Sequence, residues 1–554
     1  MIEIKTDLLV VGGGVAGLHA GIAAREKGAE VLATDKAAVA RSGCIGAGVD
    51  HFAAFLEQGE SWDTAEAWLK YVAKTGRGAL DLKIHETIFC KELKSALARM
   101  SKMGNDLRDP ATGKYNRSLA FGQPGPYLIN FKGKDFRPNQ AKEFHRLGGH
   151  ELAKAMATRL ITSNGRLAGA LAFNIRSGEL YLIRAKAVVL ATGNASRLFE
   201  NPSGNPFNCW HSPFNTGDGA ALAYRAGAAL ANVEYMYMTV VPKGFSAPGY
   251  AAFASMGCQL INAAGKRFML NYSPAGERVP RIRVVQAVLT EMAEGRGPVY
   301  IDCRHLSEPD LNHLKATLGW DKDTFPDYLA QKGLDIANEP MEIMVSEGNQ
   351  ATEAVNGGVK IDQNCAASLE GLFAAGDCCD QASAVNKSTT SGFVAGRAAA
   401  AWALKLKEFE PLDNEQVNAE KERLFKPIKR RTGTSGREFE DIICRVMSEL
   451  AGIKRNESGL KIAQGKLAQL NELQDELVAR DYHQLMRIEE ARNLLTVGQV
   501  MASAALYRKE SRFGLCHNRI DYPNTDDENW CGLVVVKKVD DKPQTSFQPL
   551  EYQV

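Results

Sequence analysis

The order of apolar runs and glycine turns at the start of the chain predicts a doubly wound α/β sheet. Residues 6–11 form a short apolar strand, residues 12–17 form a glycine turn, and residues 18–26 have the small and apolar composition of a helix. The next strand, at residues 30–34, ends at Asp35. In this order the turn points a helix N-terminus at a phosphate, and the acidic residue can bind a ribose hydroxyl. The alternative is a glycine turn in a sheet that binds no nucleotide.

Hairpin signals follow in the next part of the chain. Three β-like runs, at residues 157–163, 167–176 and 179–187, are separated by Asn-Gly and Ser-Gly turns, which are typical of hairpins. They lead into an apolar strand at residues 188–193 that ends in Ala-Thr-Gly. A glycine turn followed by such a β-meander resembles the FAD-binding scaffold of the glutathione-reductase type.

Helical periodicity dominates the C-terminal third of the chain. Residues 388–403 predict a helix whose N-terminus is capped by the run Ser-Thr-Thr-Ser. Residues 404–506 carry apolar positions at helical spacing between charged ones, which predicts a helical bundle. An apolar run at residues 533–536 predicts a strand, and we expect the last dozen residues to form a tail.

Composition narrows the possible partners. With 67 basic and 65 acidic residues the formal charge is +2, so we expect no nucleic-acid partner. No apolar run approaches the length of about eighteen residues that a membrane span needs, and the start lacks the features of a secretory signal, so we expect a cytoplasmic chain. The 11 cysteines show no C-x2-C spacing, so we expect no metal site and place any iron–sulfur cluster on another polypeptide.

Three further segments, in order along the chain, carry a more specific resemblance. They are residues 215–219 (Asn-Thr-Gly-Asp-Gly), residues 371–377 (Gly-Leu-Phe-Ala-Ala-Gly-Asp) and the polar stretch at residues 510–530. Together with the glycine turn, they resemble the flavoproteins of fumarate reductase, succinate dehydrogenase and adenylylsulfate reductase. In residues 35–43 and 386–397 the local sequence most resembles that of the adenylylsulfate reductase alpha subunit.

The resemblance implies an α/β fold with a Rossmann-like FAD-binding domain of the glutathione-reductase type, an inserted α+β capping domain and a C-terminal helical domain. The implied boundaries are 1–231 and 349–405 for the two parts of the FAD-binding domain, 232–348 for the capping (substrate) domain, 406–510 for the helical domain and 511–554 for a C-terminal segment. In relatives the helical region helps to dock the iron–sulfur partner. Here its charges are equally consistent with a solvated face.

The function implied is that of a FAD-dependent oxidoreductase subunit, which exchanges two electrons between a small polar substrate and an iron–sulfur, ferredoxin-like partner. The alternatives are an adenylylsulfate reductase alpha subunit, a stand-alone enzyme resembling L-aspartate oxidase, and a non-catalytic electron-transfer scaffold. The residues expected to hold FAD are Gly12, Gly14, Val15, Ala16, Gly17, Asp35, Lys36, Arg41, Ser42, Gly43, Ala191, Thr192, Gly193, Asn215, Asp218, Gly376, Asp377, Ser388 and Ser391.

Several positions depart from the family pattern. Gly43 follows Arg41-Ser42 where covalent relatives have the histidine that bonds FAD, so non-covalent FAD is expected. Gln286 stands where fumarate reductases are expected to carry the proton-donating arginine, and Glu353 where they have a carboxylate-binding histidine. In the adenylylsulfate reductase pattern, Val241 and Ala53 replace an expected arginine and asparagine.

Candidates for catalysis are ionisable residues expected near the flavin. A surface role is the alternative for Glu353 and Lys387, and structural packing is the alternative for His51, His211 and Arg512. The candidates chosen are Glu353, Arg281, Arg283, Lys387 and His51.

Overall fold

A mixed seven-stranded sheet forms the centre of the computed structural model, which describes residues 1–119, 123–247, 249–320, 322–349 and 355–551. Strand β1 (Ile2–Val11) lies between β2 (Val31–Asp35) and β9 (Leu180–Leu190) and is parallel to both. The short strands β6 (His150–Ala153) and β16 (Leu372–Ala374) are parallel to β2 and β9 respectively. The carboxyl ends of these five strands therefore lie along one edge of the sheet.

The β-meander predicted from the hairpin signals is confirmed. β7 (Ala155–Ser163) pairs with β8 (Arg166–Asn174), and β8 pairs with β9, both antiparallel. The runs at 179–187 and 188–193, expected as separate strands, are one continuous strand, β9. Its first half pairs with β8 and its last three residues pair with β16, so a single strand serves both the meander and the parallel sheet.

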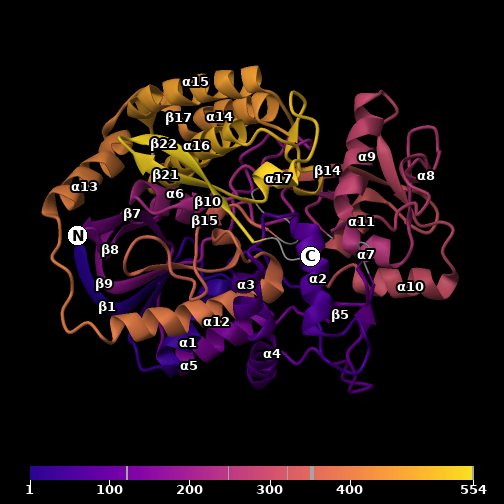
Figure 1. Cartoon of the computed structure of the whole chain (residues 1–554), viewed down its shortest axis with the longest axis horizontal. Coiled ribbons are helices and arrows are strands. Elements are labelled where there is room, and N and C mark those ends of the chain that lie inside the picture. The colour runs from indigo at the N-terminus through magenta and orange to yellow at the C-terminus, as the bar shows by residue number, and fades with distance from the viewer. Residues whose placement is uncertain (120–122, 248, 321, 350–354, 552–554) are drawn as a thin grey trace.

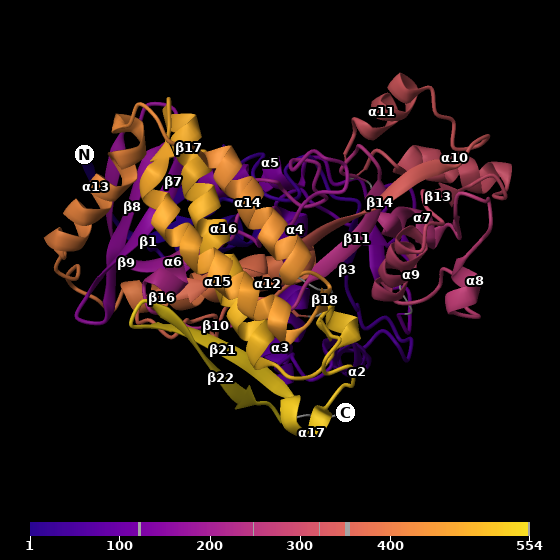
Figure 2. The ribbon, with the colours of Figure 1, turned by 90° about the horizontal axis from the view of Figure 1, so that it is seen from above.

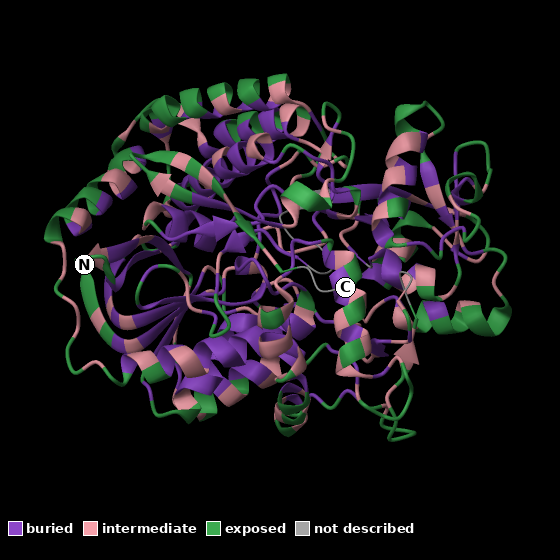
Figure 3. Ribbon diagram, in the orientation of Figure 1, coloured by how far each residue is buried: buried purple, intermediate pink, exposed green. Residues whose placement is uncertain are grey.

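Helices α1 (Val15–Glu26) and α12 (Ala384–Ala403) pack closely against each other beside this sheet (Figure 1). Close packing depends on glycine, because a Cβ on Gly396 would lie 2.1 Å from the carbonyl oxygen of Ala20. A Cβ on Gly392 would lie 2.4 Å from the carbonyl oxygen of Ala16. In Figure 3 much of α12 is buried, as these contacts require.

The predicted start of this second helix is wrong. α12 begins at Ala384, so Ser388 and Ser391 lie inside the helix and not at its cap. The Ser391 hydroxyl is accommodated inside the helix because it donates to a carbonyl of the preceding turn, that of Lys387, at 2.6 Å.

A second sheet, with its own core, forms the capping domain at one side of the molecule (Figure 1). Its strand order is β11-β14-β13-β12, and all its neighbours are antiparallel. The sheet and the helices around it occupy much of residues 232–348, the segment proposed for the capping domain. Its elements are β11 (Tyr237–Pro242), α7 (Tyr250–Ser255), β12 (Gln259–Ile261), α8 (Met269–Tyr272), α9 (Arg281–Ala293), β13 (Val299–Asp302), α10 (Glu308–Thr317), α11 (Phe325–Lys332) and β14 (Met341–Asn349).

The predicted helical bundle is present as α13 (Asn414–Lys429), α14 (Gly436–Leu450), α15 (Glu457–Leu473) and α16 (Tyr482–Tyr507). Figure 2 shows α14, α15 and α16 side by side. Their apolar residues belong to the same continuous core as the central sheet. No helix in the part of the chain described here combines the length and apolarity of a membrane span.

The expected C-terminal tail is a strand for most of its length. β21 (Gly532–Val539), predicted from its apolar run, pairs antiparallel with β22 (Lys542–Pro549). β21 also pairs with β10 (Leu230–Ala231), which joins it to β15 (Gly358–Val359). Arg512 is 1% exposed, and its Nε donates to Glu510 at 2.6 Å. Its Nη1 also donates to the carbonyl oxygen of Arg77, so Arg512 has the structural packing role that was its alternative.

A small separate sheet and several further helices belong to the FAD-binding part of the chain. β3 (His51–Ala53), β5 (Leu128–Asn130) and β4 (Arg117–Ser118) form a small antiparallel sheet. The other helices of the FAD-binding part are α2 (Ala65–Gly76), α3 (Leu82–His85), α4 (Leu93–Lys102), α5 (Phe136–Arg146) and α6 (Asp218–Arg225).

Candidate functional site

One cavity of about 550 Å³ lies at the carboxyl edge of the parallel strands. Open α/β sheets bind ligands at this edge because the loops that leave the strands converge there. The expected cofactor residues that line it are Gly12, Gly14, Val15, Ala16, Asp35, Lys36, Arg41, Ser42, Gly43, Ala191, Thr192, Gly193, Asn215, Asp218, Gly376, Asp377 and Ser388. Gly17 and Ser391 are not among its lining residues.

The first turn brings the backbone of two strands close together. Gly12 has a φ of +100°, and a Cβ there would lie 2.5 Å from the Ala191 carbonyl oxygen. A Cβ on Gly17 would lie 1.9 Å from the Gly12 carbonyl oxygen, so Gly17 acts behind the turn by allowing α1 to approach it. Only glycine satisfies both the left-handed conformation and the two contacts.

Asp35 organises the loops around this turn. Its Oδ2 accepts hydrogen bonds from the Gly13 N–H (2.7 Å) and from Ser42 Oγ (2.6 Å), and its Oδ1 accepts one from the Ala37 N–H (2.7 Å). Asp35 is 9% exposed and lines the cavity. One carboxylate thus fixes the glycine turn and the loop that contains Ser42.

Lys36 and Asp218 form an ion pair in the cavity wall. Lys36 Nζ lies 2.8 Å from Asp218 Oδ2 and 2.8 Å from Glu490 Oε1. Burial alone would lower the pKa of Lys36, but these two carboxylates outweigh burial and leave that pKa raised. Asp218 Oδ1 also accepts from Asn493 Nδ2 at 2.9 Å, so both Lys36 and Asp218 are tied to α16.

The turn after β16 forms another part of the cavity wall, through Gly376 and Asp377. Gly376 has a φ of +67°, and its N–H donates to Ser391 Oγ at 3.0 Å. Ser391 therefore supports the turn from behind although it does not line the cavity. Asp377 accepts from the Ala384 N–H at 3.1 Å, and burial raises the pKa of its carboxyl.

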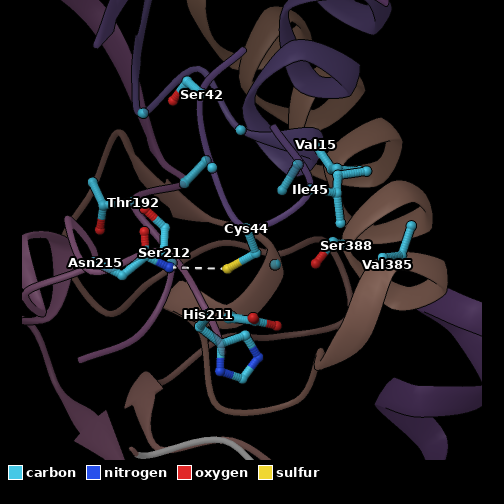
Figure 4. Close-up of a pocket in the computed structure, with 18 of the residues that line it drawn as sticks. Val15, Ser42, Cys44, Ile45, Thr192, His211, Ser212, Asn215, Val385 and Ser388 are labelled. Atoms are coloured by element: carbon cyan, nitrogen blue, oxygen red, sulfur yellow. Dashed lines mark hydrogen bonds between the residues drawn. The ribbon is translucent and has the colours of Figure 1, made fainter. Parts of the chain in front are cut away.

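Cys44, His211 and Asp377 meet on one side of the cavity. Each places one donor atom within 4.8 Å of the other two. Figure 4 shows His211 and Cys44 pointing towards the same space, and Asn215 Nδ2 donates to Cys44 Sγ at 3.2 Å. The sequence placed His211 in this region, whereas no pattern distinguished Cys44.

Three of the five catalytic candidates line the cavity: His51, Lys387 and Arg281. His51 Nδ1 lies 2.7 Å from Asp50 Oδ1. Burial alone would raise the pKa of Asp50, but the charge of His51 and its hydrogen bond lower it. Lys387 is 3% exposed, so its alternative as a solvated surface lysine is wrong.

The other two candidates are Arg283, which the structure describes, and Glu353, which it does not. Arg283 is exposed on α9 and is not among the lining residues. Glu353 falls outside the described residues. Gln286 does not line the cavity whereas Arg281, at the start of the same helix, does. The position that the resemblance assigned to the family arginine is therefore not part of the cavity lining, and the arginine that this helix contributes to the lining is Arg281.

Val241 and Ala53 are the two positions that depart from the adenylylsulfate reductase pattern. Val241 is fully buried in β11 and does not line the cavity, whereas Ala53 does. His483 and Met486 of α16 also line it. Nothing in the local sequence indicated these two residues, because they reach the cavity only through the packing of the helical region on the sheet.

Comparison with known proteins covers nearly the whole chain. Residues 7–392 match the family described as "FAD binding domain", and residues 441–554 match "Fumarate reductase flavoprotein C-term". The chain is 28% identical to an uncharacterised FAD-dependent oxidoreductase of Methanocaldococcus jannaschii, over 100% of this chain and 99% of that protein. It is 30% identical to a fumarate reductase flavoprotein subunit of Mycobacterium tuberculosis, over 70% of this chain and 69% of that protein.

The fold is similar to that of solved flavoproteins. Adenylylsulfate reductase from Archaeoglobus fulgidus superposes with a TM-score of 0.86 at 24% identity, over 99% of this chain and 96% of that one. This likeness covers the capping and helical regions as well as the central sheet.

Proposed function

The chain belongs to the fumarate reductase and succinate dehydrogenase family of FAD-dependent oxidoreductases, and on this premise we propose that it is the flavoprotein subunit of a two-electron oxidoreductase. The proposed reaction exchanges electrons between a small polar substrate and an iron–sulfur partner. The observation that carries the proposal is the cavity, in which three glycine-bearing strand ends meet the side chains of His51, Lys387 and Arg281.

The residues that line this cavity fit FAD, the family's cofactor. Any Cβ at Gly12 would fill the space beside the Ala191 carbonyl group. The turns at Gly193 and Gly376 have φ of +75° and +67°. Glycine at such turns lets the backbone approach a pyrophosphate, and the N-terminus of α1 supplies partial positive charge there. We propose that Asp35 binds the ribose and that Asp377 binds the ribityl chain.

When bound, FAD supplies a ring that takes up or releases two electrons. We propose that His51 holds and moves a proton for the substrate, with Asp50 orienting its ring from 2.7 Å. Lys387, which is 3% exposed, places positive charge on the cavity wall. Such a charge stabilises negative charge that develops on a reduced ring or on a substrate anion.

We propose that the electrons leave through a separate iron–sulfur protein. The described cysteines include no C-x2-C cluster site, and the M. tuberculosis relative is named as a subunit. We further propose that FAD is bound without a covalent bond. Gly43 lines the cavity after Arg41 and Ser42, and a glycine has no side-chain atom to form that bond.

The test is purification of the chain with any co-purifying protein, followed by visible spectroscopy. We expect a FAD spectrum, full release of the flavin into the supernatant after acid precipitation, and reduction by dithionite with reoxidation by an iron–sulfur protein. Colourless protein that refuses FAD would contradict the proposal. Rapid reoxidation by oxygen with peroxide release would favour the oxidase-like alternative instead.

A further inference from the structure

Two aromatic rings and a guanidinium group form a cluster in the cavity wall, and two of the three residues, Tyr237 and Arg281, belong to the capping domain. The rings of Trp210 and Tyr237 are stacked, with centroids 5.9 Å apart and planes inclined by 24°. Arg281 Cζ lies over both rings, 5.5 Å from the centroid of Trp210 and 5.3 Å from that of Tyr237. All three residues line the cavity.

From this cluster we propose that the substrate is a planar aromatic carboxylate. The inference rests on the proposed function, because it assigns a substrate class to the same cavity. It is narrower than that function, which requires only a small polar substrate.

The charge of the proposed ligand follows from Arg281. Arg281 is 9% exposed, and it is the first residue of the 13-residue helix α9. A helix N-terminus adds partial positive charge to that of the side chain. A buried guanidinium binds a carboxylate through two parallel hydrogen bonds, which selects a flat anionic group over a neutral amide.

The flat shape follows from the two rings and from what holds them in place. Tyr237 is 8% exposed in β11, and Trp210 packs on Gly249, where a Cβ would lie 3.0 Å from the indole Nε1. His211 adds a third ring, with its centroid 4.7 Å from that of Trp210. Ordered aromatic walls favour planar unsaturated ligands over puckered saturated ones, because the ring quadrupoles add to the area that is buried.

The test compares matched ligands on the FAD-loaded protein. Benzoate and cyclohexanecarboxylate share a charge but differ in flatness, and benzoate and benzamide share a shape but differ in charge. We expect benzoate to bind at least about 10-fold more tightly than either, by titration calorimetry and by the change in the flavin spectrum, since tenfold is the scale of about one well-placed contact.

Variants then assign each preference to its residue. Trp210→Leu should abolish the preference for benzoate over cyclohexanecarboxylate, and Arg281→Gln should abolish the preference over benzamide, whereas Arg281→Lys should retain part of it. Trp320→Leu and Arg278→Gln are matched controls, because neither residue lines the cavity. Both controls should keep both preferences.

The flavin content of every variant is measured in parallel, and Tyr237→Leu replaces Trp210→Leu if the latter loses FAD. Equal binding of benzoate and cyclohexanecarboxylate, equal binding of benzoate and benzamide, or binding of fumarate alone would overturn the inference. If FAD binds and the iron–sulfur partner accepts electrons while the ligands are not distinguished, only the substrate class fails. If FAD does not bind, the proposed function itself fails.

Discussion

Lys36 Nζ lies 2.8 Å from Glu490 Oε1, although the two residues are 454 positions apart in the chain. Lys36 follows the second strand of the sheet, and Glu490 lies in the middle of α16. The other oxygen of Glu490 accepts from Arg197 Nη2 at 2.8 Å and from Arg487 Nη1 at 2.7 Å. One buried carboxylate thus joins the wall of the cofactor cavity to the helical region.

Replacing Glu490 by glutamine should strongly destabilise the protein. The side chain is fully buried, and its loss would leave three cations without their shared partner. Breaking a buried pair in this way costs about 3–5 kcal/mol. Chemical denaturation followed by circular dichroism measures the change in the free energy of unfolding.

Glu457→Gln is the matched control for Glu490→Gln. Glu457 pairs with Lys461 one turn along an exposed helix face, at 2.5 Å, and such pairs contribute about 0.5 kcal/mol or less. Burial alone would raise the pKa of Glu490, but Lys36 and Arg197 lower it to about 2. The charge therefore stabilises the fold above pH about 4.3, and the difference between wild type and Glu490→Gln should shrink as the pH falls towards 2. A loss equal to that of the control would contradict the role of Glu490.

Replacing a glycine by alanine can cost free energy in two ways, through a left-handed backbone conformation and through a steric clash of the new Cβ. Gly12 and Gly28 separate these two costs. Gly12→Ala must adopt a φ of +100° and also place its Cβ 2.5 Å from the Ala191 oxygen. Gly28→Ala must adopt a φ of +86° but meets nothing within 4 Å. The backbone term alone costs about 1–2 kcal/mol. We therefore expect Gly28→Ala to keep its flavin and Gly12→Ala to lose it, measured as the ratio of flavin to protein absorbance after gel filtration. Equal flavin content in the two variants would show that the contact with Ala191 is unimportant.

Asp35→Asn should weaken flavin binding without unfolding the protein. The amide keeps one oxygen but replaces the other by a donor, which loses the bonds from Gly13 and Ser42 or the bond from Ala37. Hydrogen bonds to a charged group contribute about 1.5–3 kcal/mol, so a rise in the FAD dissociation constant of about 10- to 100-fold is expected. Fluorescence titration of the flavin-free protein measures it.

The control for Asp35→Asn is Asp362→Asn. Asp362 also accepts from backbone N–H groups, at Asn364 (2.8 Å) and Ala366 (2.9 Å), but it is exposed and does not line the cavity. Its replacement should leave flavin affinity unchanged. If both variants bind FAD as the wild type does, Asp35 has no special part in the site.

Local signals were sufficient for much of the fold. The glycine turn, the two hairpin turns before β8 and β9, and the helical periodicity from α13 to α16 each depend on residues close together in sequence. The start of α12 could not be found in this way, because Ser391 and its neighbours have the composition of a cap but donate to carbonyls inside the helix.

Positions set by long-range packing were not predictable. The resemblance to fumarate reductases placed the family arginine at Gln286, whereas the residue of the same helix that lines the cavity is Arg281. The contact of Lys36 with Glu490, and the approach of His483 to the same cavity, depend on how α16 packs against the sheet. No spacing within the sequence encodes these contacts.

Asp380 should make the stability of the protein fall as the pH rises towards neutrality. Its carboxyl is fully buried, accepting from the Ile361 N–H at 3.1 Å and from Gln381 Nε2 at 3.1 Å. Burial raises its pKa to about 7 from an ordinary value of 3.8. The folded protein then holds a proton that the unfolded chain releases, so the stabilisation is complete below pH about 4 and is lost as the pH rises through 7.

Asp380→Asn tests this effect, because an amide resembles the protonated carboxyl at every pH. The free energy of unfolding of the wild type, minus that of the variant, should fall between pH 4 and pH 8 by up to about 4 kcal/mol, since one pKa unit corresponds to about 1.4 kcal/mol. Asp540→Asn, in the exposed turn before β22, should show no such trend. If the difference between wild type and Asp380→Asn is the same at both pH values, the folded protein holds Asp380 ionised and burial does not control its charge.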